Sequence, residues 1–150
     1  MGLPYCLTKK DIMIDYIELL KTHNLKATFQ RINIIEIVDK NGHIDIDGIY
    51  EQIKQKLPTI SLATVYKNIL SMTQSGVLVE VPIVGKKSKY ELKKADHIHL
   101  VCTECGAVED KNCIDITNQA IHSLTDKEQF NLSTRQINLY GICKNCKKAS

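Results

Sequence analysis

The chain has 150 residues, of which 43% are hydrophobic and 25% are charged, a composition typical of one folded globular domain or two small ones. No apolar run approaches the roughly 18 residues of a membrane-spanning helix, and the first residues lack the pattern of a signal peptide. These features exclude a disordered or membrane protein and predict a cytoplasmic location. The net charge of +3 is too small to indicate a partner.

Helices are predicted throughout the first half of the chain. Apolar residues recur there at helical spacing, and residues suited to helix starts precede each later segment: Thr28, then Asp45 or Asp47, then Ser61. Gly76 suits the end of the last helix, because glycine readily adopts the left-handed conformation found there. The predicted segments are 9–23, 28–39, 45–57 and 61–76.

The pattern then changes to that of strands. Residues 77–92 predict a hairpin that turns around Gly85, Lys86 and Lys87, and Pro82 should place its first strand at a sheet edge or interrupt it. Helices followed by such a hairpin are typical of a winged helix-turn-helix. A boundary is expected near 93–96, followed by strands at 97–102 and 107–110, a helix at 114–128 and a strand at 131–140.

The fourth helix has one polar side that suits the major groove of DNA. A helical wheel gathers apolar residues on one side (Leu62, Val65, Ile69, Met72) and polar ones on the other (Thr64, Lys67, Asn68, Ser71), with Tyr66 at the boundary. The polar side has no carboxylate that phosphates would repel, and the free N–H groups near Ser61 can meet a phosphate. An ordinary surface helix is the alternative, but the hairpin lysines Lys86, Lys87 and Lys89 favour DNA binding.

Cysteine spacing is the strongest signal in the chain. Cys102, Cys105, Cys143 and Cys146 form two C-x-x-C pairs, and two such pairs complete a tetrahedral site whose usual occupant is zinc. Four thiolates leave no open coordination position, so this site is interpreted as structural. Four reduced thiols or two disulfides are the alternative, which the cysteine spacing and a cytosolic setting together disfavour.

A second metal site is predicted around the sequence His97-Ile98-His99. In a strand, both histidines face the side opposite to Cys102, so they cannot share its metal. Glu91 and Asp110 flank the pair, and such nitrogen and oxygen ligands suit ferrous iron, manganese or zinc. Two exposed histidines are the alternative interpretation.

Five motifs in this order resemble the ferric uptake regulator family: LKATFQR at 25–31, SLATVYKNI at 61–69, YEL at 90–92, HIHLVCTECG at 97–106 and LYGICKNC at 139–146. The resemblance implies an α+β fold, with a winged-helix DNA-binding domain at 1–92 and an α/β dimerisation and metal-binding domain at 93–150. It also implies a homodimer on a palindromic double-stranded DNA operator and metal-dependent repression.

The resemblance also assigns roles to individual residues. His43 matches the histidine that the first domain contributes to the regulatory iron or manganese site, together with Glu91, His97, His99 and Asp110. A metal that joins the two domains would set the spacing of the reading helices in a dimer. The four cysteines match the structural zinc ligands, and Tyr66 matches a DNA contact.

Two sensing modes remain open within the family. Asp110 resembles the peroxide-sensing branch, in which ferrous iron promotes oxidation of a ligand histidine, here His43 or His97. Glu91 resembles the iron branch, which predicts reversible metal sensing without oxidation. A zinc hydrolase or deaminase is disfavoured because H-x-H replaces the deaminase H-x-E. Thiol sensing by Cys6 or Cys113 is disfavoured because neither has a C-x-x-C partner.

Overall fold

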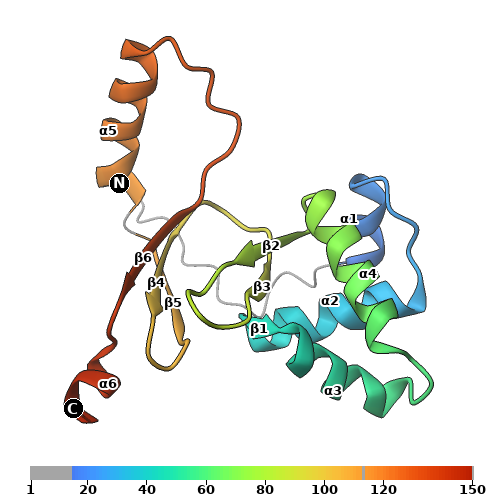
Figure 1. Ribbon diagram of the computed structural model, residues 1–150. Coiled ribbons are helices and arrows are strands. Elements are labelled where there is room, and N and C mark those ends of the chain that lie inside the picture. Colours follow the sequence, from blue (N-terminus) through green and yellow to red (C-terminus); the bar gives the residue numbers. More distant parts are fainter. Residues whose placement is uncertain (1–14, 113, 150) are drawn as a thin grey trace, which may run out of the picture.

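A computed structural model describes residues 15–112 and 114–149. In Figure 1, the helices of residues 16–74 and a small sheet lie at one end, and a second sheet with the helices of residues 114–149 lies at the other. None of the described helices has the length and apolar character that a membrane crossing requires. The elements are α1 Tyr16–Thr22, α2 Phe29–Asn41, β1 Ile44–Asp45, α3 Ile46–Lys56, α4 Leu62–Gln74, β2 Leu78–Val81, β3 Lys89–Leu92, β4 Ile98–Cys102, β5 Val108–Lys111, α5 Ile114–Lys127, β6 Ile137–Gly141 and α6 Lys144–Ala149.

Side chains cap the N-termini of the first four helices. At the start of α2, the Thr28 side chain accepts a hydrogen bond from the backbone N–H of Arg31, as predicted. At the start of α4, the Ser61 side chain accepts one from the backbone N–H of Thr64, also as predicted. Of the two candidates for α3, the cap is Asp45, which accepts from Gly48 N–H at 2.8 Å. Helix α1 is capped by Asp15, and the predicted residues 9–14 lie outside the described part.

The helices enclose one apolar core. Ile34, Ile49, Ile53 and Met72 are fully buried in it, and β2 and β3 close it with Leu78 and Tyr90. The helical wheel correctly predicted which side of α4 is buried, except at Leu62, its first residue. Leu62 is 45% exposed, because it lies at the helix start, where no other element covers it.

The first sheet has the order β1-β3-β2, with antiparallel pairing throughout. Strand β2 lies at an edge and ends at Val81, directly before Pro82, as the proline predicted. Strand β1 was not predicted, because two residues are too few to show alternation. Its pairing of Ile44 with Tyr90 brings the neighbouring His43 close to β3.

The second sheet has the order β5-β4-β6, with β4 antiparallel to β5 and parallel to β6. A parallel neighbour requires a long connection, which α5 and residues 128–136 provide. The strand predicted at 131–140 occupies only Ile137–Gly141, because residues 131–136 have no strand partner in the described part. Helix α6 was not predicted.

The two sheets meet through the end of β2 and the segment that follows it. Val81 and Ile83 pack on Val101 of β4, and the Tyr140 hydroxyl donates to the carbonyl oxygen of Pro82 at 2.9 Å. Helix α5 projects away from both sheets in Figure 1, and its Leu124 is 61% exposed. The fold therefore holds the ends of β3 and β4 together and leaves an apolar helix face uncovered.

Candidate metal centres and nucleic-acid interface

Side chains from both sheets converge at one point. His43 comes from the turn after α2, Glu91 from β3, His99 from β4 and Asp110 from β5. Each offers a ligand atom, and these four atoms all lie within 4.8 Å of one another. The cross-strand pairing of His99 with Asp110 explains how two elements of the second sheet reach the same point.

The distances within this cluster are short and its centre is buried. His43 Nε2 lies 3.0 Å from Glu91 Oε2 and 3.1 Å from Asp110 Oδ1. His99 Nε2 lies 2.9 Å from Glu91 Oε1. Glu91 and His99 are each only 1% exposed, so the protein has removed a carboxylate and an imidazole from water at one place, which requires compensation.

His97 joins the cluster in a way that neutral histidines alone do not explain. Its Nδ1 faces the carbonyl oxygen of Ala95 at 2.8 Å, so the ring proton lies there and Nε2 carries a lone pair. His99 Nδ1 likewise faces Asn138 Oδ1 at 2.9 Å. The two Nε2 atoms nevertheless point at each other across 2.8 Å. Two facing lone pairs repel unless a cation lies between them.

Three further buried atoms of the cluster, His43 Nε2, Glu91 Oε2 and Asp110 Oδ1, make no well-aligned hydrogen bond, although His43 Nε2 lies within ion-pair distance of both oxygens and Lys94 Nζ within that of Glu91 Oε2. Buried polar atoms without an aligned hydrogen bond are rare in proteins and call for an explanation such as an ion. All three face the same space as the two imidazole nitrogens. This donor set of nitrogen and oxygen atoms fits a divalent iron, manganese or zinc ion.

The charge of Glu91 is set by opposing influences. Burial raises the pKa of its carboxyl, but His43, Lys94 and His99 oppose that effect and lower it to about 2. Lys94 Nζ lies 3.1 Å from Glu91 Oε2 and 2.5 Å from Asp110 Oδ2. The sequence analysis missed Lys94 and Asn138, because a linker lysine and a strand asparagine carry no motif.

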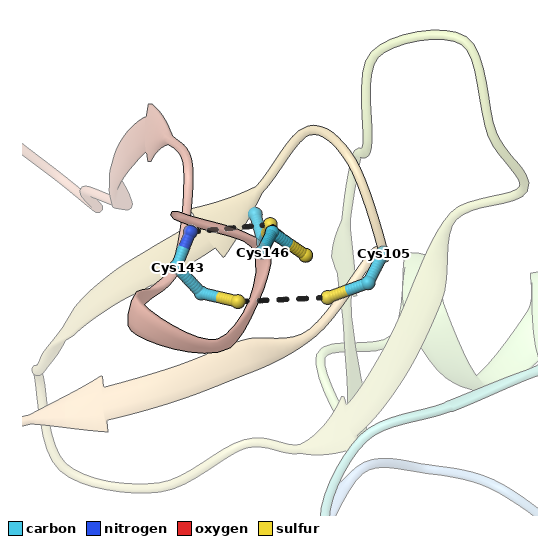
Figure 2. A group of neighbouring side chains, drawn as sticks. Cys105, Cys143 and Cys146 are labelled. Carbon is cyan, nitrogen blue, oxygen red and sulfur yellow. Dashed lines mark hydrogen bonds between the residues drawn. The ribbon is translucent and has the colours of Figure 1, made fainter. Parts of the chain in front are cut away.

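The four predicted cysteines form a second cluster. Strand β4 ends at Cys102, the turn after it carries Cys105, and the segment after β6 carries Cys143 and Cys146. Cys102 Sγ lies 3.9 Å from Cys146 Sγ, and Cys105 Sγ lies 3.8 Å from Cys143 Sγ. Figure 2 shows the Cys105 and Cys143 side chains pointing toward each other across this gap.

These spacings match a zinc tetrahedron. A Zn–S bond of about 2.3 Å separates two sulfurs of a tetrahedral site by about 3.8 Å, whereas a disulfide requires about 2.05 Å. All four cysteines are free. Backbone N–H groups of Cys105 and Cys143 lower the pKa of Cys102 to about 6, which favours the thiolate that a metal binds.

The predicted DNA-reading side of α4 faces outward. Tyr66 is 52% exposed and Lys67 is exposed, whereas Thr64 and Asn68 are half-buried. The Ser61 hydroxyl caps the helix, and the Asn68 amide donates to the Thr64 carbonyl oxygen at 2.9 Å. Tyr66 and Lys67 are therefore the freest side chains of the predicted set on this helix.

The hairpin turn lies beside the start of α4. Lys86 and Lys87 are exposed, and Lys87 forms an ion pair with Asp47 at the start of α3. A groove runs between the helix and the hairpin, with Tyr66, Lys67 and Lys87 in its lining. Lys67 of the helix and Lys87 of the turn thus border one surface, whereas the Lys86 side chain lies beside Gly106 in the turn after β4.

The ferric uptake regulator family model matches residues 22–140, a range that includes the whole histidine–carboxylate cluster, α4, and Cys102 and Cys105 of the four-cysteine cluster. The chain belongs to the ferric uptake regulator family. Proteins of this family are metal-responsive transcriptional regulators that act as dimers on DNA, and this chain is a metal-responsive transcriptional regulator.

Named relatives of this regulator fall into two groups. The ferric uptake regulation protein of Bordetella parapertussis is 35% identical over 132 residues, which cover 86% of this chain and 94% of the relative. The peroxide operon regulator of Bacillus subtilis is 31% identical over 135 residues, 88% and 91% of the two chains. The solved peroxide stress regulator of Campylobacter jejuni is 36% identical with a TM-score of 0.72, and the match covers 89% of this chain and 100% of that one.

The structure of this regulator brings together the side chains of all the residues that the sequence predicted as metal ligands. The five regulatory candidates share one centre and the four cysteines another, and the α+β fold agrees with the solved family structures. The turn at Gly106 follows the second cysteine with φ of 75°, a conformation that glycine adopts without strain.

Proposed function

We propose that this chain is a metal-dependent transcriptional repressor that binds palindromic operator DNA as a homodimer. The observation that carries the proposal is the convergence of His43 and Glu91 from the first sheet region with His97, His99 and Asp110 from the second. An ion held by these five residues joins residues 1–92, which we assign as the DNA-binding domain, to residues 93–150, the dimerisation and metal-binding domain.

The residues of the chain explain how metal would control DNA binding. Without an ion, the facing nitrogens of His97 and His99 repel each other. Ferrous iron or manganese held by the five residues would draw their side chains together and fix the angle between the two domains. Because each reading helix α4 is rigidly packed in the first domain, that angle sets the spacing of the two helices in a dimer.

Exposed apolar residues support the homodimer. On the second sheet and the segment after it, Leu139 is 52% exposed and Ile142 is 53% exposed, and Leu124 on α5 is 61% exposed. Apolar patches of this kind are typical of an interface. A DNA-bound regulator of this kind would act in the cytoplasm, by regulation rather than catalysis.

We assign two further roles from the geometry. Zinc in the four-cysteine site is structural, since it ties α6 back to the end of β4. Ser61, Thr64, Tyr66, Lys67 and Asn68 on α4 and Lys86 and Lys87 on the turn contact operator DNA. The ion pair of Lys87 with Asp47 would then open so that the lysine can reach a phosphate.

The signal that this repressor senses is proposed to be peroxide. Ferrous iron in the five-residue site would supply the reactivity that splits hydrogen peroxide. In this reaction, one oxygen atom of hydrogen peroxide is added to a ring carbon of His43 or His97, and the other oxygen atom leaves as water. The oxidised imidazole is a poorer ligand, so metal and DNA are released. Two of the named relatives are peroxide regulators, which supports this choice.

Sensing of the iron or manganese level is the second candidate. The 35% identity to a ferric uptake regulation protein favours it. This function uses the same five ligands without histidine oxidation, so metal release is reversible. The two candidates differ in one measurable product, the oxidised histidine.

The first experiment tests metal control. A DNA duplex is selected in vitro with manganese-loaded protein, and its affinity is measured by fluorescence anisotropy with and without manganese. Wild-type protein should bind at least roughly tenfold more tightly with metal, and H99A should lose this response. H122A is the matched control, because His122 is exposed on α5 away from both clusters. A full metal response in H99A would overturn the proposed function.

The second experiment separates the two signals. Iron-loaded protein is treated with hydrogen peroxide, digested and analysed by mass spectrometry, with manganese-loaded protein as the control. Peroxide sensing predicts one added oxygen on the peptide of His43 or His97 and loss of DNA binding only with iron. Unmodified histidines and retained DNA binding would favour the metal-level sensor instead.

A further inference from the structure

Lys94 occupies a distinctive position beside the histidine–carboxylate cluster. It lies in the linker between β3 and β4, and its side chain is 45% exposed. Its Nζ reaches back to Glu91 Oε2 at 3.1 Å and to Asp110 Oδ2 at 2.5 Å. In the described part of the chain, it is the one lysine or arginine within ion-pair distance of either carboxylate.

The two oxygens of Asp110 therefore have different surroundings. Oδ1 faces the imidazoles, 3.1 Å from His43 Nε2 and 3.5 Å from the Nε2 atoms of His97 and His99, and it has no hydrogen-bond partner. Oδ2 forms an ion pair with the ammonium group of Lys94 instead. A carboxylate held in this way presents one oxygen to the cluster.

We propose that Lys94 is a positioning residue that restricts Asp110 to a single ligating oxygen and weakens metal binding at the regulatory site. This inference rests on the proposed function, because it requires that the cluster binds a divalent ion. Lys94 opposes binding in two ways. It neutralises the carboxylates while no ion is present, and it places a positive charge near the ion once it is bound. The resulting affinity keeps the metal exchangeable, as a sensor requires.

Neighbouring cations do not duplicate this arrangement. Arg135 is paired with Asp96 at 2.9 Å, and Lys111 is paired with Glu109 at 3.3 Å. Lys111 adjoins Asp110 in sequence, but alternation along β5 sends its side chain to the opposite face. Lys111 therefore provides a control in which the same charge is removed close by without touching the Asp110 carboxylate.

The test compares K94Q and K111Q with the wild type as zinc-loaded dimers. Manganese affinity is measured by titration calorimetry, and the number of light-atom ligands around bound manganese by X-ray absorption. We expect K94Q to bind manganese about tenfold more tightly, the size of effect that a half-exposed charge has at this range. One additional oxygen ligand should appear in K94Q. K111Q should match the wild type in both measurements.

Each result bears on the inference. Wild-type affinity and ligand number in K94Q would overturn it while leaving the proposed function intact. A wild-type protein that binds no manganese beside its zinc would overturn the proposed function and this inference with it. K94M, which keeps an unbranched apolar stem without the charge, repeats the measurement if K94Q does not fold. A purely structural role of Lys94 would change stability but not the ligand number.

Discussion

The two halves of the chain are held together by different forces. In the first half, helices α2, α3 and α4 bury a continuous set of apolar residues, among them Ile34, Ile53 and Met72. In the second half, the buried apolar cluster of the described residues is small, and two of its three members come from the first sheet side: Val81 from the end of β2 and Ile83 from the segment after it. The second sheet thus has little core of its own.

The difference shows where metal is needed. Burial of apolar area stabilises the first half without any ligand. The second half exposes apolar side chains such as Leu124 and Leu139 and is closed by the four-cysteine site and, as proposed, by a partner subunit. We therefore expect metal and partner to determine whether the second half is ordered, and the first half to remain folded without them.

The largest effect is expected from loss of zinc. C143S removes a ligand from the site, and structural zinc contributes on the order of 10 kcal/mol to the folding of small zinc domains. We expect β4, β5 and β6 to lose hydrogen-exchange protection and the dimer to dissociate, while α2 and α4 stay protected. Exchange mass spectrometry and size-exclusion chromatography check both outcomes.

C6S is the control for this substitution, because Cys6 has no C-x-x-C partner. It should retain about one zinc per chain. If C143S lost its zinc but kept full protection in the second sheet, the two halves would not differ in the way described here.

A smaller effect is expected in the first half. I53A empties a fully buried position and should lower the free energy of unfolding by about 2–5 kcal/mol. Urea unfolding of the zinc-loaded protein, followed by circular dichroism, measures this change. V84A is the control, because Val84 is 69% exposed and its truncation should change stability by less than about 0.5 kcal/mol. An equally small effect of I53A would contradict a core based on burial.

The smallest effect on stability is expected from the hydrogen bond between Tyr16 and Asp39 in the first half. Burial and the hydrogen bond to Asp39 raise the pKa of Tyr16 to about 12. A raised pKa stabilises the fold while the phenol is protonated, so this contribution is complete below about pH 10 and is lost between about pH 10 and 12. Y16F should cost about 1 kcal/mol at pH 8. Its difference from the wild type should shrink toward pH 12 in urea unfolding, and a constant difference would show that the hydrogen bond contributes nothing.

Local signals in the sequence predicted most of the fold. Thr28 and Ser61 are predictable as caps because a hydroxyl before a helix satisfies free N–H groups. The alternation around His97 and His99 correctly separated the two metal clusters, since the side-chain period of a strand is two. Two predictions were wrong: that Leu62 lies on the buried side of its helix, and that the last strand begins at residue 131. Periodicity shows which side of an element is apolar, but not whether another element packs against it.

The candidate site was predictable only as far as its motifs reach. Cysteine spacing and the H-x-H pair identify ligands, and the family resemblance adds His43. The roles of Lys94 and Asn138 could not be predicted, because they depend on contacts between residues far apart in the sequence. Asn138 reaches His99 because β6 pairs with β4 in parallel, and no local sequence pattern indicates this register.

Strand β4 carries His99 and, three residues further on, Cys102, which corresponds to about 10 Å of extended backbone. Damage at the cysteine end would therefore disturb the histidine end through a single stiff segment. If the proposed function is correct, reagents that remove zinc or alkylate thiols would release the operator without any change at the histidine–carboxylate site, and this release would be mistaken for a response to the sensed signal. Cell experiments with strong chelators or oxidants need a parallel zinc count before derepression is attributed to sensing.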